Sequence, residues 1–315
     1  MTAWREFQWE HEEPDAGRDR LSPDTIEGAD FIQQPAAAVD EFVVCAYNVE
    51  RGLCLDEQLR TFAGGAGMPK PDVLLISEAD RGCTRSGNRN VAREYAEALG
   101  MCYVYAVEFT ELPRIWGPGG RIDHPCEHGN AIISRYPLGN VRLIRHERAR
   151  SWDSTAQRLL RVGQPRRGGR VALAADVRVG DRLLRVYSVH FESGRVNFGP
   201  RKRADFRYTQ AVELIDDAAD GGTAVLIGGD MNVVRYLGSG DGRSTQEPAT
   251  TALLAADFVD AHADLPFSER VTTDSGVAID LILGRGVQFT GFGVGPRAVW
   301  GGLSDHLPVW ASVHL

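Results

Sequence analysis

The feature that most constrains the fold is a series of short apolar runs, each of which ends at a polar residue. One run, Ala224 to Ile227, lies between two glycine pairs and leads to Asp230 and Asn232. Its length and its bounding glycines predict a buried strand that ends in a tight bend. If the backbone stays extended, residues two apart share a face, which would place this acid and this amide on one side. A simple turn would account for the same residue types.

Other predicted strands end in the same way. A polar residue closes or directly follows an apolar run at Asn48, at Glu78 and at His190. A carboxylate at the end of a buried strand is costly to bury unless it is paired or binds a cation. For each position the alternative is an ordinary turn or capping residue. Together the strand ends are the candidate functional positions.

One acid lies inside an apolar run rather than after it. Asp280 is flanked by Ile279 and Leu281 in the strand predicted over 277–283. An unpaired carboxylate there would be destabilising or forced neutral, so a partner is expected. His306, just before the last predicted strand, is the candidate, because a carboxylate–imidazole pair satisfies the acid and raises the basicity of the ring.

Composition sets broad limits. The chain has 315 residues, 43% hydrophobic and 25% charged, which is typical of a globular protein with one large domain or two. The net charge of −8 gives no general attraction to polyanions, so a phosphate-bearing substrate must be held by local positive charge or by a metal. No transmembrane segment and no secretory signal are evident, and we expect a cytoplasmic monomer. The five cysteines show no metal-site spacing and are expected to be free, mostly buried thiols.

The N-terminal segment differs from the rest of the chain. Residues 1–40 are acidic, contain three prolines and show no sustained period, which predicts an extended arm. Regular structure is predicted to begin at Glu41. Further on, a helix is predicted up to Leu99, with Asn88 or Asn90 as its cap and Gly100 as its end.

Arginine is concentrated in two stretches of this acidic protein. A solvated surface is the ordinary explanation, and a phosphate-binding rim is the alternative. Arg195 and Arg201 lead into a predicted helix, while His128 and Asn130 lie at the start of another strand, after a loop rich in glycine and proline. These four residues are the candidate substrate contacts. The first stretch contains Arg145, Arg148, Arg150, Arg158, Arg161, Arg166, Arg167 and Arg170.

The polar strand ends occur in a familiar order. From about Phe42 onward, the chain resembles the endonuclease/exonuclease/phosphatase superfamily, which includes deoxyribonucleases, abasic-site endonucleases, inositol phosphatases and sphingomyelinases. The resemblance implies one catalytic domain over 41–315, built as a four-layer α/β sandwich of two facing, largely antiparallel mixed sheets with helices outside. The matching motifs are Asn48, Glu78, His190, Asp230 with Asn232, Asp280, and Ser304-Asp305-His306.

The resemblance also implies a metal site. Glu78 would be the principal ligand of Mg2+ or Mn2+, assisted by Asn48 and Asp305, and hard oxygen ligands suit these ions. This sequence has Tyr47 where a tryptophan is common, and Glu50 could supply a second metal contact, so the number of metals stays open.

The implied reaction is in-line attack of water on a phosphoester. Asp230 would orient or deprotonate the water, and Asn232 would hold a nonbridging oxygen. His306, oriented by Asp280, would stabilise charge on phosphorus, and His190 would support the leaving oxygen. The substrate would be a phosphodiester of nucleic acid or, alternatively, a small-molecule or lipid-headgroup phosphate. A catalytically inactive binding module is a third reading, which the full set of polar strand ends disfavours.

Overall fold

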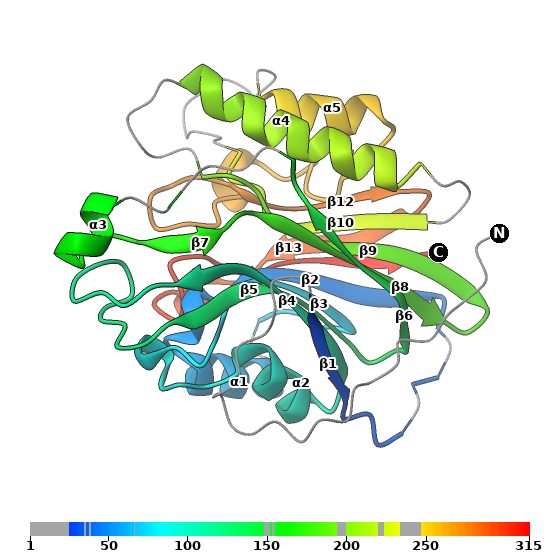
Figure 1. Cartoon of the computed structure of the whole chain (residues 1–315). Helices are drawn as coiled ribbons and strands as arrows, with labels where there is room; N and C mark the ends of the chain where they lie inside the picture. Colours follow the sequence, from blue (N-terminus) through cyan, green and yellow to red (C-terminus); the bar gives the residue numbers. More distant parts are fainter. Residues whose placement is uncertain are drawn as a thin grey trace.

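The computed structural model describes residues 25–34, 36–37, 39–65, 67–147, 152, 155–193, 200–219, 224–233 and 247–315. Within these ranges, an eight-stranded and a six-stranded sheet face each other. Helices cover the outer face of each sheet, which gives four layers (Figure 1). The predicted α/β sandwich with two mixed, largely antiparallel sheets is confirmed.

The first sheet contains the N-terminal half of the chain and the two last strands. Its one parallel pair, β2 and β3, lies in the interior of the sheet. In spatial order its strands are β1 (Ile26–Asp30), β4 (Cys102–Glu111), β5 (Cys126–Ser134), β3 (Val73–Arg81), β2 (Glu41–Asn48), β14 (Val309–His314) and β13 (Gln288–Val294), with β7 (Arg166–Gly168) paired to β4.

The second sheet is built in the same way around its own parallel pair, β9 and β10. Two successive strands of this sheet, β8 and β9, form an antiparallel hairpin. In spatial order its strands are β11 (Val259–Asp260), β12 (Asp280–Arg285), β10 (Ala224–Asp230), β9 (Arg182–His190), β8 (Val171–Val179) and β6 (Leu138–Arg145).

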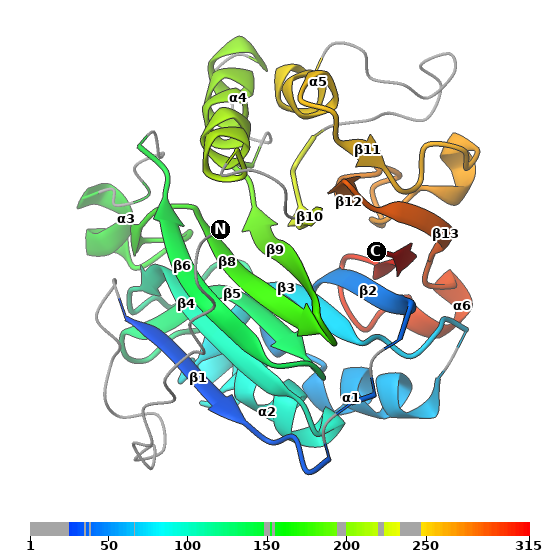
Figure 2. The same ribbon diagram turned by 90° about the vertical axis from the view of Figure 1, so that its right-hand side faces the viewer.

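The layers are held together by three large apolar cores. Side chains such as Leu75, Val186 and Leu226 fill the space between the sheets, and separate cores lie beneath the helices on each outer face. Figure 2 shows α1 and α2 on one side and α4 and α5 on the other. The helical segments are α1 (Leu55–Gly64), α2 (Val91–Leu99), α3 (Thr155–Leu160), α4 (Pro200–Asp217), α5 (Pro248–Ala255) and α6 (Arg297–Trp300), with short 3-10 turns η1 (Glu50–Gly52), η2 (Thr84–Ser86) and η3 (Phe267–Glu269). Among the described residues, no helix is long and apolar enough to cross a membrane.

Local signals explain some boundaries closely. The side chain of Asn90 accepts a hydrogen bond from the backbone N–H of Arg93, so it caps α2 as predicted, and Gly100 ends the helix in the left-handed conformation. The arm prediction needs a correction, because β1 already pairs with β4 and regular structure therefore begins before Glu41. The division into an arm and a catalytic domain stays a prediction.

The glycine pair before Asp230 does not form the predicted bend. Both glycines lie inside β10, because the strand continues to Asp230. A Cβ on Gly228 would lie 2.7 Å from the Cδ1 atom of Leu75 in the facing sheet. Gly229 has φ 145°, and a Cβ there would lie 1.9 Å from the carbonyl oxygen of Val189. The close approach of the β9 backbone therefore requires glycine at 229, whereas the contact at 228 is with the end of a flexible side chain.

The prediction of free thiols is wrong for two cysteines. Cys83 and Cys126 form a disulfide across 43 residues, while Cys45 and Cys102 are free and buried. Cys83 follows β3 and Cys126 begins β5, and these antiparallel strands bring the two cysteines together, which their spacing did not indicate. Disulfides are typical of oxidising compartments, so this bond does not favour the expected cytoplasmic location, which stays a prediction.

Loss of this disulfide is expected to destabilise the protein by roughly 2–4 kcal/mol, because the bond restricts the unfolded chain over a long loop. The double substitution Cys83→Ser/Cys126→Ser should lower the free energy of unfolding measured in denaturant. A reductant should destabilise the unsubstituted protein and leave the double variant unchanged. Equal stability of the oxidised and reduced proteins would contradict the assignment.

Candidate active site

The polar strand ends converge at one edge of the sandwich. In the second sheet, Asp230 lies opposite His190 on one side and opposite Asp280 on the other. From the first sheet, the Asn48 Nδ2 atom donates a hydrogen bond to Asp230 Oδ2 over 3.2 Å. The two sheets therefore contribute to a single cluster of side chains.

Asp230 lies at the centre of this cluster. Its Oδ1 atom accepts a hydrogen bond of 2.9 Å from the backbone N–H of Asn232. Its Oδ2 atom lies 3.4 Å from His190 Nε2 and 3.8 Å from His306 Nε2. Burial raises the pKa of Asp230, and the nearby Asp280 charge adds to this, while the two histidines oppose it. With its raised pKa, Asp230 suits the role of a proton acceptor.

His306 and Asp280 form the pair that the sequence predicted. The Nδ1 atom of His306 lies 2.7 Å from Asp280 Oδ2. Burial alone would lower the pKa of His306, but the charges of Asp280 and Asp230 outweigh it and raise the pKa to about 10. The Ser304 hydroxyl donates to the Asn48 carbonyl and accepts from the His306 backbone N–H, which fixes this loop to β2.

Ligand atoms of Asp230, Asp280 and His306 lie within 4.8 Å of one another. Such a group could hold a metal ion in principle. The raised His306 pKa explains the group without one, since a protonated imidazole between two carboxylates balances their charge. Asp280 keeps one buried oxygen, Oδ1, without a hydrogen-bond partner in the structure.

Glu78 is directed into the site by an irregularity in its strand. The pairing of β3 with β5 shifts register between Ile76 and Ala79, and Glu78 has φ 58°. Such bulges re-aim side chains and often lie beside active sites. Burial raises the pKa of Glu78, but Arg51, 3.2 Å away, and nearby histidines and arginines hold that pKa well below its usual value. Glu78 is therefore an anion.

Backbone strain is concentrated around this residue. Among the described residues, eight non-glycine residues have positive φ, and four of them lie at the site: Glu50, Arg51, Glu78 and Asn232. A left-handed backbone costs a non-glycine residue about 1–2 kcal/mol. Because such strain persists where the surroundings impose it, the clustering supports a functional role for this edge.

Three carboxylates, those of Glu50, Glu78 and Asp305, repel one another electrostatically beside Asn48. The backbone N–H of Asp305 donates to Glu50 Oε2 over 3.0 Å. Burial raises the pKa of Glu50, and the charges of Asp305 and Glu78 raise it further. The pKa of Asp305 is raised by burial and by Glu78, against the lowering effect of His306. A divalent cation would offset this repulsion, so these hard oxygen donors fit Mg2+ or Mn2+.

His190 is held from behind by a buried arginine. Arg170 Nη1 lies 2.6 Å from His190 Nδ1 and 3.0 Å from Glu108 Oε2. Because a guanidinium can only donate, Nδ1 must accept, and the ring carries its proton on Nε2. That N–H is directed toward Asp230 and Glu78. Burial raises the pKa of Glu108, but the adjacent Arg170 guanidinium opposes this, and the pKa falls to about 2.

Of the four residues predicted to contact substrate, two lie in the interior of the protein and two have side chains that the structure does not describe. His128 and Asn130 are buried in β5, where His128 Nδ1 lies 2.9 Å from Asp80 Oδ1 and Asn130 donates to the Val171 carbonyl. Burial lowers the pKa of His128. Their direct contact with substrate stays a prediction, and the structure gives them interior positions. Arg195 and the side chain of Arg201 lie outside the described residues.

Asn232 is oriented by its own backbone rather than by an extended strand. Its φ is 50°, and its Nδ2 atom donates to the Phe191 carbonyl over 3.0 Å. The extended backbone that would place Asp230 and Asn232 on one face is not present, since β10 ends at Asp230. Its predicted hold on a phosphate oxygen stays a prediction.

Several residues at the site were not singled out as functional from the sequence. Glu108 lies within the apolar strand β4, a signal of the same kind as the one that identified Asp280. Arg51 and Arg170 gave no such signal, because arginines are common on surfaces. Another arginine of the rich stretch, Arg166, is also buried, between the rings of Phe109 and Trp152 at 3.8 and 3.9 Å.

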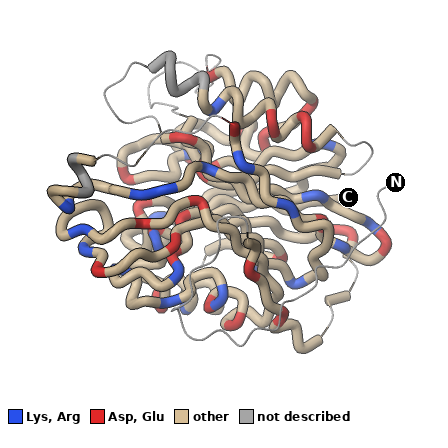
Figure 3. The backbone as a smooth tube through the Cα atoms, viewed as in Figure 1, with Lys and Arg blue, Asp and Glu red and all other residues tan. Residues whose placement is uncertain are grey.

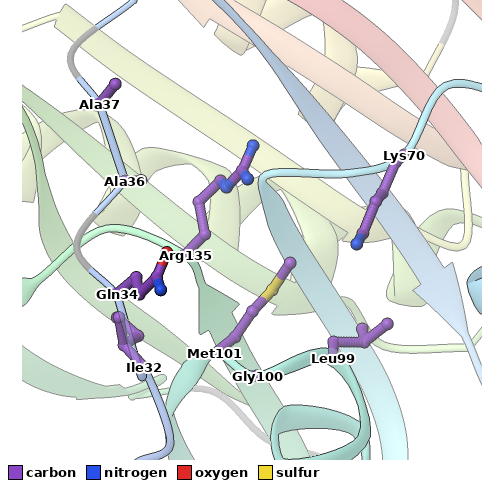
Figure 4. A pocket seen from close by; sticks show the side chains of 9 residues that line it. All are labelled: Ile32, Gln34, Ala36, Ala37, Lys70, Leu99, Gly100, Met101 and Arg135. Atoms are coloured by element: carbon purple, nitrogen blue, oxygen red, sulfur yellow. The ribbon is translucent and has the colours of Figure 1, made fainter.

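A cavity of about 320 Å³ lies at the opposite ends of the strands. Figure 4 shows Lys70 and Arg135 on two sides of it, with Met101 between them. Arg135 already forms an ion pair with Asp72 at 2.5 Å. This cavity is separate from the convergent strand ends and contributes nothing to the cluster.

Comparisons with known proteins identify the family and the fold. A model described as the Endonuclease/Exonuclease/phosphatase family matches residues 45–306. An endonuclease/exonuclease/phosphatase structure from Beutenbergia cavernae superposes with TM-score 0.62 and 14% identity, covering 88% of this chain and 72% of that chain. The structure of D. rerio TDP2 humanized by 14 mutations superposes with TM-score 0.55 and 17% identity, covering 88% of this chain and 100% of that chain. The human Nocturnin catalytic domain with bound sulfate superposes with TM-score 0.56 and 15% identity, covering 91% of this chain and 97% of that chain. No curated protein matches.

Proposed function

We propose that this chain, which belongs to the Endonuclease/Exonuclease/phosphatase family, hydrolyses a phosphodiester by in-line attack of an activated water molecule, with Mg2+ or Mn2+ as cofactor. The family consists of phosphoester hydrolases. The observation that carries the proposal is the position of Asp230 between His190 and His306 at the converging strand ends.

The side chains at this edge supply complementary roles. Asp230, with its raised pKa, would take a proton from the attacking water. His306 is cationic at neutral pH and would stabilise negative charge that develops on the phosphoryl group. His190 presents its Nε2–H to the same space and would donate to the leaving oxygen.

The cluster of acidic side chains beside Asn48 would hold the metal cofactor. The ligands would be Glu78, Asn48 and Asp305, with Glu50 adjacent to them. When bound, Mg2+ or Mn2+ supplies Lewis-acid stabilisation of the charge on the phosphoryl oxygens. Arg51, 3.2 Å from Glu78, orients that carboxylate in the structure.

Two substrate classes are supported by different observations. A structure of D. rerio TDP2 holds a single-stranded DNA product, and that chain shares this fold with TM-score 0.54. This protein has exposed apolar side chains, such as those of Trp116 and Leu159. They favour a lipid-headgroup phosphate as the substrate instead of nucleic acid.

A hydrolysis screen separates these classes. The purified chain would be assayed with Mg2+ and with Mn2+ on plasmid DNA, a single-stranded oligonucleotide, bis-p-nitrophenyl phosphate, sugar phosphates and a phospholipid dispersion. Cleavage of a diester supports the proposal and its pattern identifies the class. Activity on monoesters alone would replace it with a phosphatase, and inactivity on every substrate would favour a binding module.

The Asp280–His306 pair is expected to act as one unit. Asp280→Asn should lower the pKa of His306 from about 10, because it removes the negative charge that favours the imidazolium. As the pH is raised, His306 in the variant should therefore lose its proton at a lower pH than His306 in the unsubstituted protein. NMR titration of His306 in the metal-free protein measures this shift.

A double-mutant cycle tests the same pair by activity. The loss of kcat/KM in Asp280→Asn/His306→Ala should be much smaller than the product of the two single losses, because residues that act together are non-additive. Fully multiplicative losses, combined with an unmoved His306 titration, would show that the two residues work independently.

A further inference from the structure

An exposed apolar surface lies beside the active site. We call it the apolar tip, and it combines the loop after β4 with α3 and the residues that follow α3. Its members are Ile115 (53% exposed), Trp116 (75%), Leu159 (79%), Leu160 (68%) and Val162 (38%). Large exposed apolar groups that are contiguous mark interaction sites, whereas single ones are ordinary.

Hydrogen bonds join the two segments of the tip. The backbone N–H groups of Ile115 and Trp116 both reach the carbonyl oxygen of Arg161, at 2.8 and 3.4 Å. Trp116 also forms a parallel bridge with Val162. The five side chains therefore belong to one local structure rather than to unrelated loops.

This structure adjoins the catalytic edge. The same loop passes over the site at Gly119, where a Cβ would lie 2.8 Å from the Cδ atom of Arg51. On its other side the chain continues through β7 to Arg170, which contacts His190. Figure 1 shows α3 and β7 at one end of the sandwich. A surface that binds the tip would thus lie close to the strand ends.

Exposed cations lie beside the tip, although the net charge of the chain is −8. The stretch 142–170 contains nine arginines, no lysine and two acids, Glu147 and Asp153, and two of these arginines, Arg166 and Arg170, are buried. Among the described side chains, Arg161 and Arg167 are exposed. Figure 3 shows basic residues along β7 and near α3. The tip is therefore apolar and is flanked by cations.

We propose that the apolar tip docks on an anionic lipid surface. Aliphatic side chains and a tryptophan would enter the interface between headgroups and acyl chains, while the arginines contact anionic headgroups. Nucleic acid is a poorer match, because single strands stack on aromatic rings and the tip offers one aromatic ring among four aliphatic side chains. Docking would bring the site to phosphodiesters of lipid headgroups. It does not depend on the proposed hydrolysis, because binding is measured without turnover.

The test is co-sedimentation of the full chain with two kinds of vesicle, pure phosphatidylcholine and phosphatidylcholine mixed with phosphatidylglycerol. We expect binding to the anionic vesicles that weakens as salt is added. Leu159→Glu/Leu160→Glu should reduce the partition coefficient at least about tenfold, and Trp116→Ala at least about threefold. The control Leu254→Glu, which alters an apolar residue of similar type on α5 that is 48% exposed, should bind as the unsubstituted chain does.

Five results would overturn the proposal. The first three are absence of binding to anionic vesicles, equal loss in the Leu254→Glu control, and full binding by both tip variants when their thermal melts are normal. The fourth is tip-dependent binding of a single-stranded oligonucleotide without vesicle binding. Fifth, a dimer in sedimentation velocity that the tip variants abolish, again without vesicle binding, would assign the surface to a second copy of the chain.

Discussion

Asp230→Asn should lower kcat/KM at least about a hundredfold, and His306→Ala should do the same, because each removes an interaction made in the transition state. The amide that replaces the Asp230 carboxylate cannot accept a proton from water at neutral pH. Without the His306 ring, no cation remains at the position 3.8 Å from Asp230. Steady-state kinetics on a diester substrate measures both losses.

The large loss of activity in Asp230→Asn should not be accompanied by a loss of stability. Since folding raises the pKa of Asp230, the charged carboxylate opposes folding as pH rises above the pKa of the unfolded chain. Removing that charge should leave the free energy of unfolding at neutral pH unchanged or raise it. Thermal melts of the metal-free proteins measure this effect.

A second buried acid supplies the control for this substitution. Asp176 on β8 pairs with Arg185 at 2.9 Å, away from the converging strand ends. Asp176→Asn should therefore lower stability and leave kcat within about twofold. Near-normal rates in folded Asp230→Asn or His306→Ala protein would show that the assignment of the strand ends is wrong.

Removal of divalent metal should reduce hydrolysis to background. EDTA should abolish activity, and Mg2+ or Mn2+ should restore it, because the carboxylates of Glu50, Glu78 and Asp305 form a hard donor set whose mutual repulsion a cation relieves. The Glu78→Gln variant with metal present should be as inactive as the unsubstituted protein in EDTA. Undiminished turnover in chelator, or restoration by zinc alone, would contradict the proposed cofactor.

Metal binding can also be measured without catalysis. A ligand that binds only the folded state raises the melting temperature, so Mg2+ or Mn2+ should stabilise the unsubstituted chain. Glu78→Gln should lose this stabilisation. Glu213→Gln is the control, because Glu213 lies on α4 beside His146 and takes no part in the strand-end cluster. A metal-induced shift that survives in Glu78→Gln would mean that Glu78 is not the principal ligand.

Much of the fold and several residues of the candidate site were identified from the sequence because the relevant signals are local. Short apolar runs predict buried strands by their length and their boundaries, and Asn90 caps its helix through a bond to a residue three positions away. An acid within an apolar run, such as Asp280, indicates that a partner is present, because burying an unpaired carboxylate is costly. The order of these motifs was sufficient for the family resemblance, which the family match confirmed.

Other features depend on strand order and register, which no local pattern contains. The contact of Asn48 with Asp230 spans 182 residues and two sheets. The tautomer of His190 follows from Arg170, an arginine indistinguishable in sequence from its solvated neighbours. The disulfide likewise required β3 and β5 to be adjacent.

The sequence by itself therefore determined which residues end buried strands and which acid needs a partner, because hydrophobic period, turn chemistry and the cost of burying charge act within a few residues. Only the tertiary structure decided which of these side chains touch. Pairing between strands brings together residues far apart in the chain, and the orientation of Glu78 and Asn232 depends on a bulge and on positive φ angles that surrounding contacts impose.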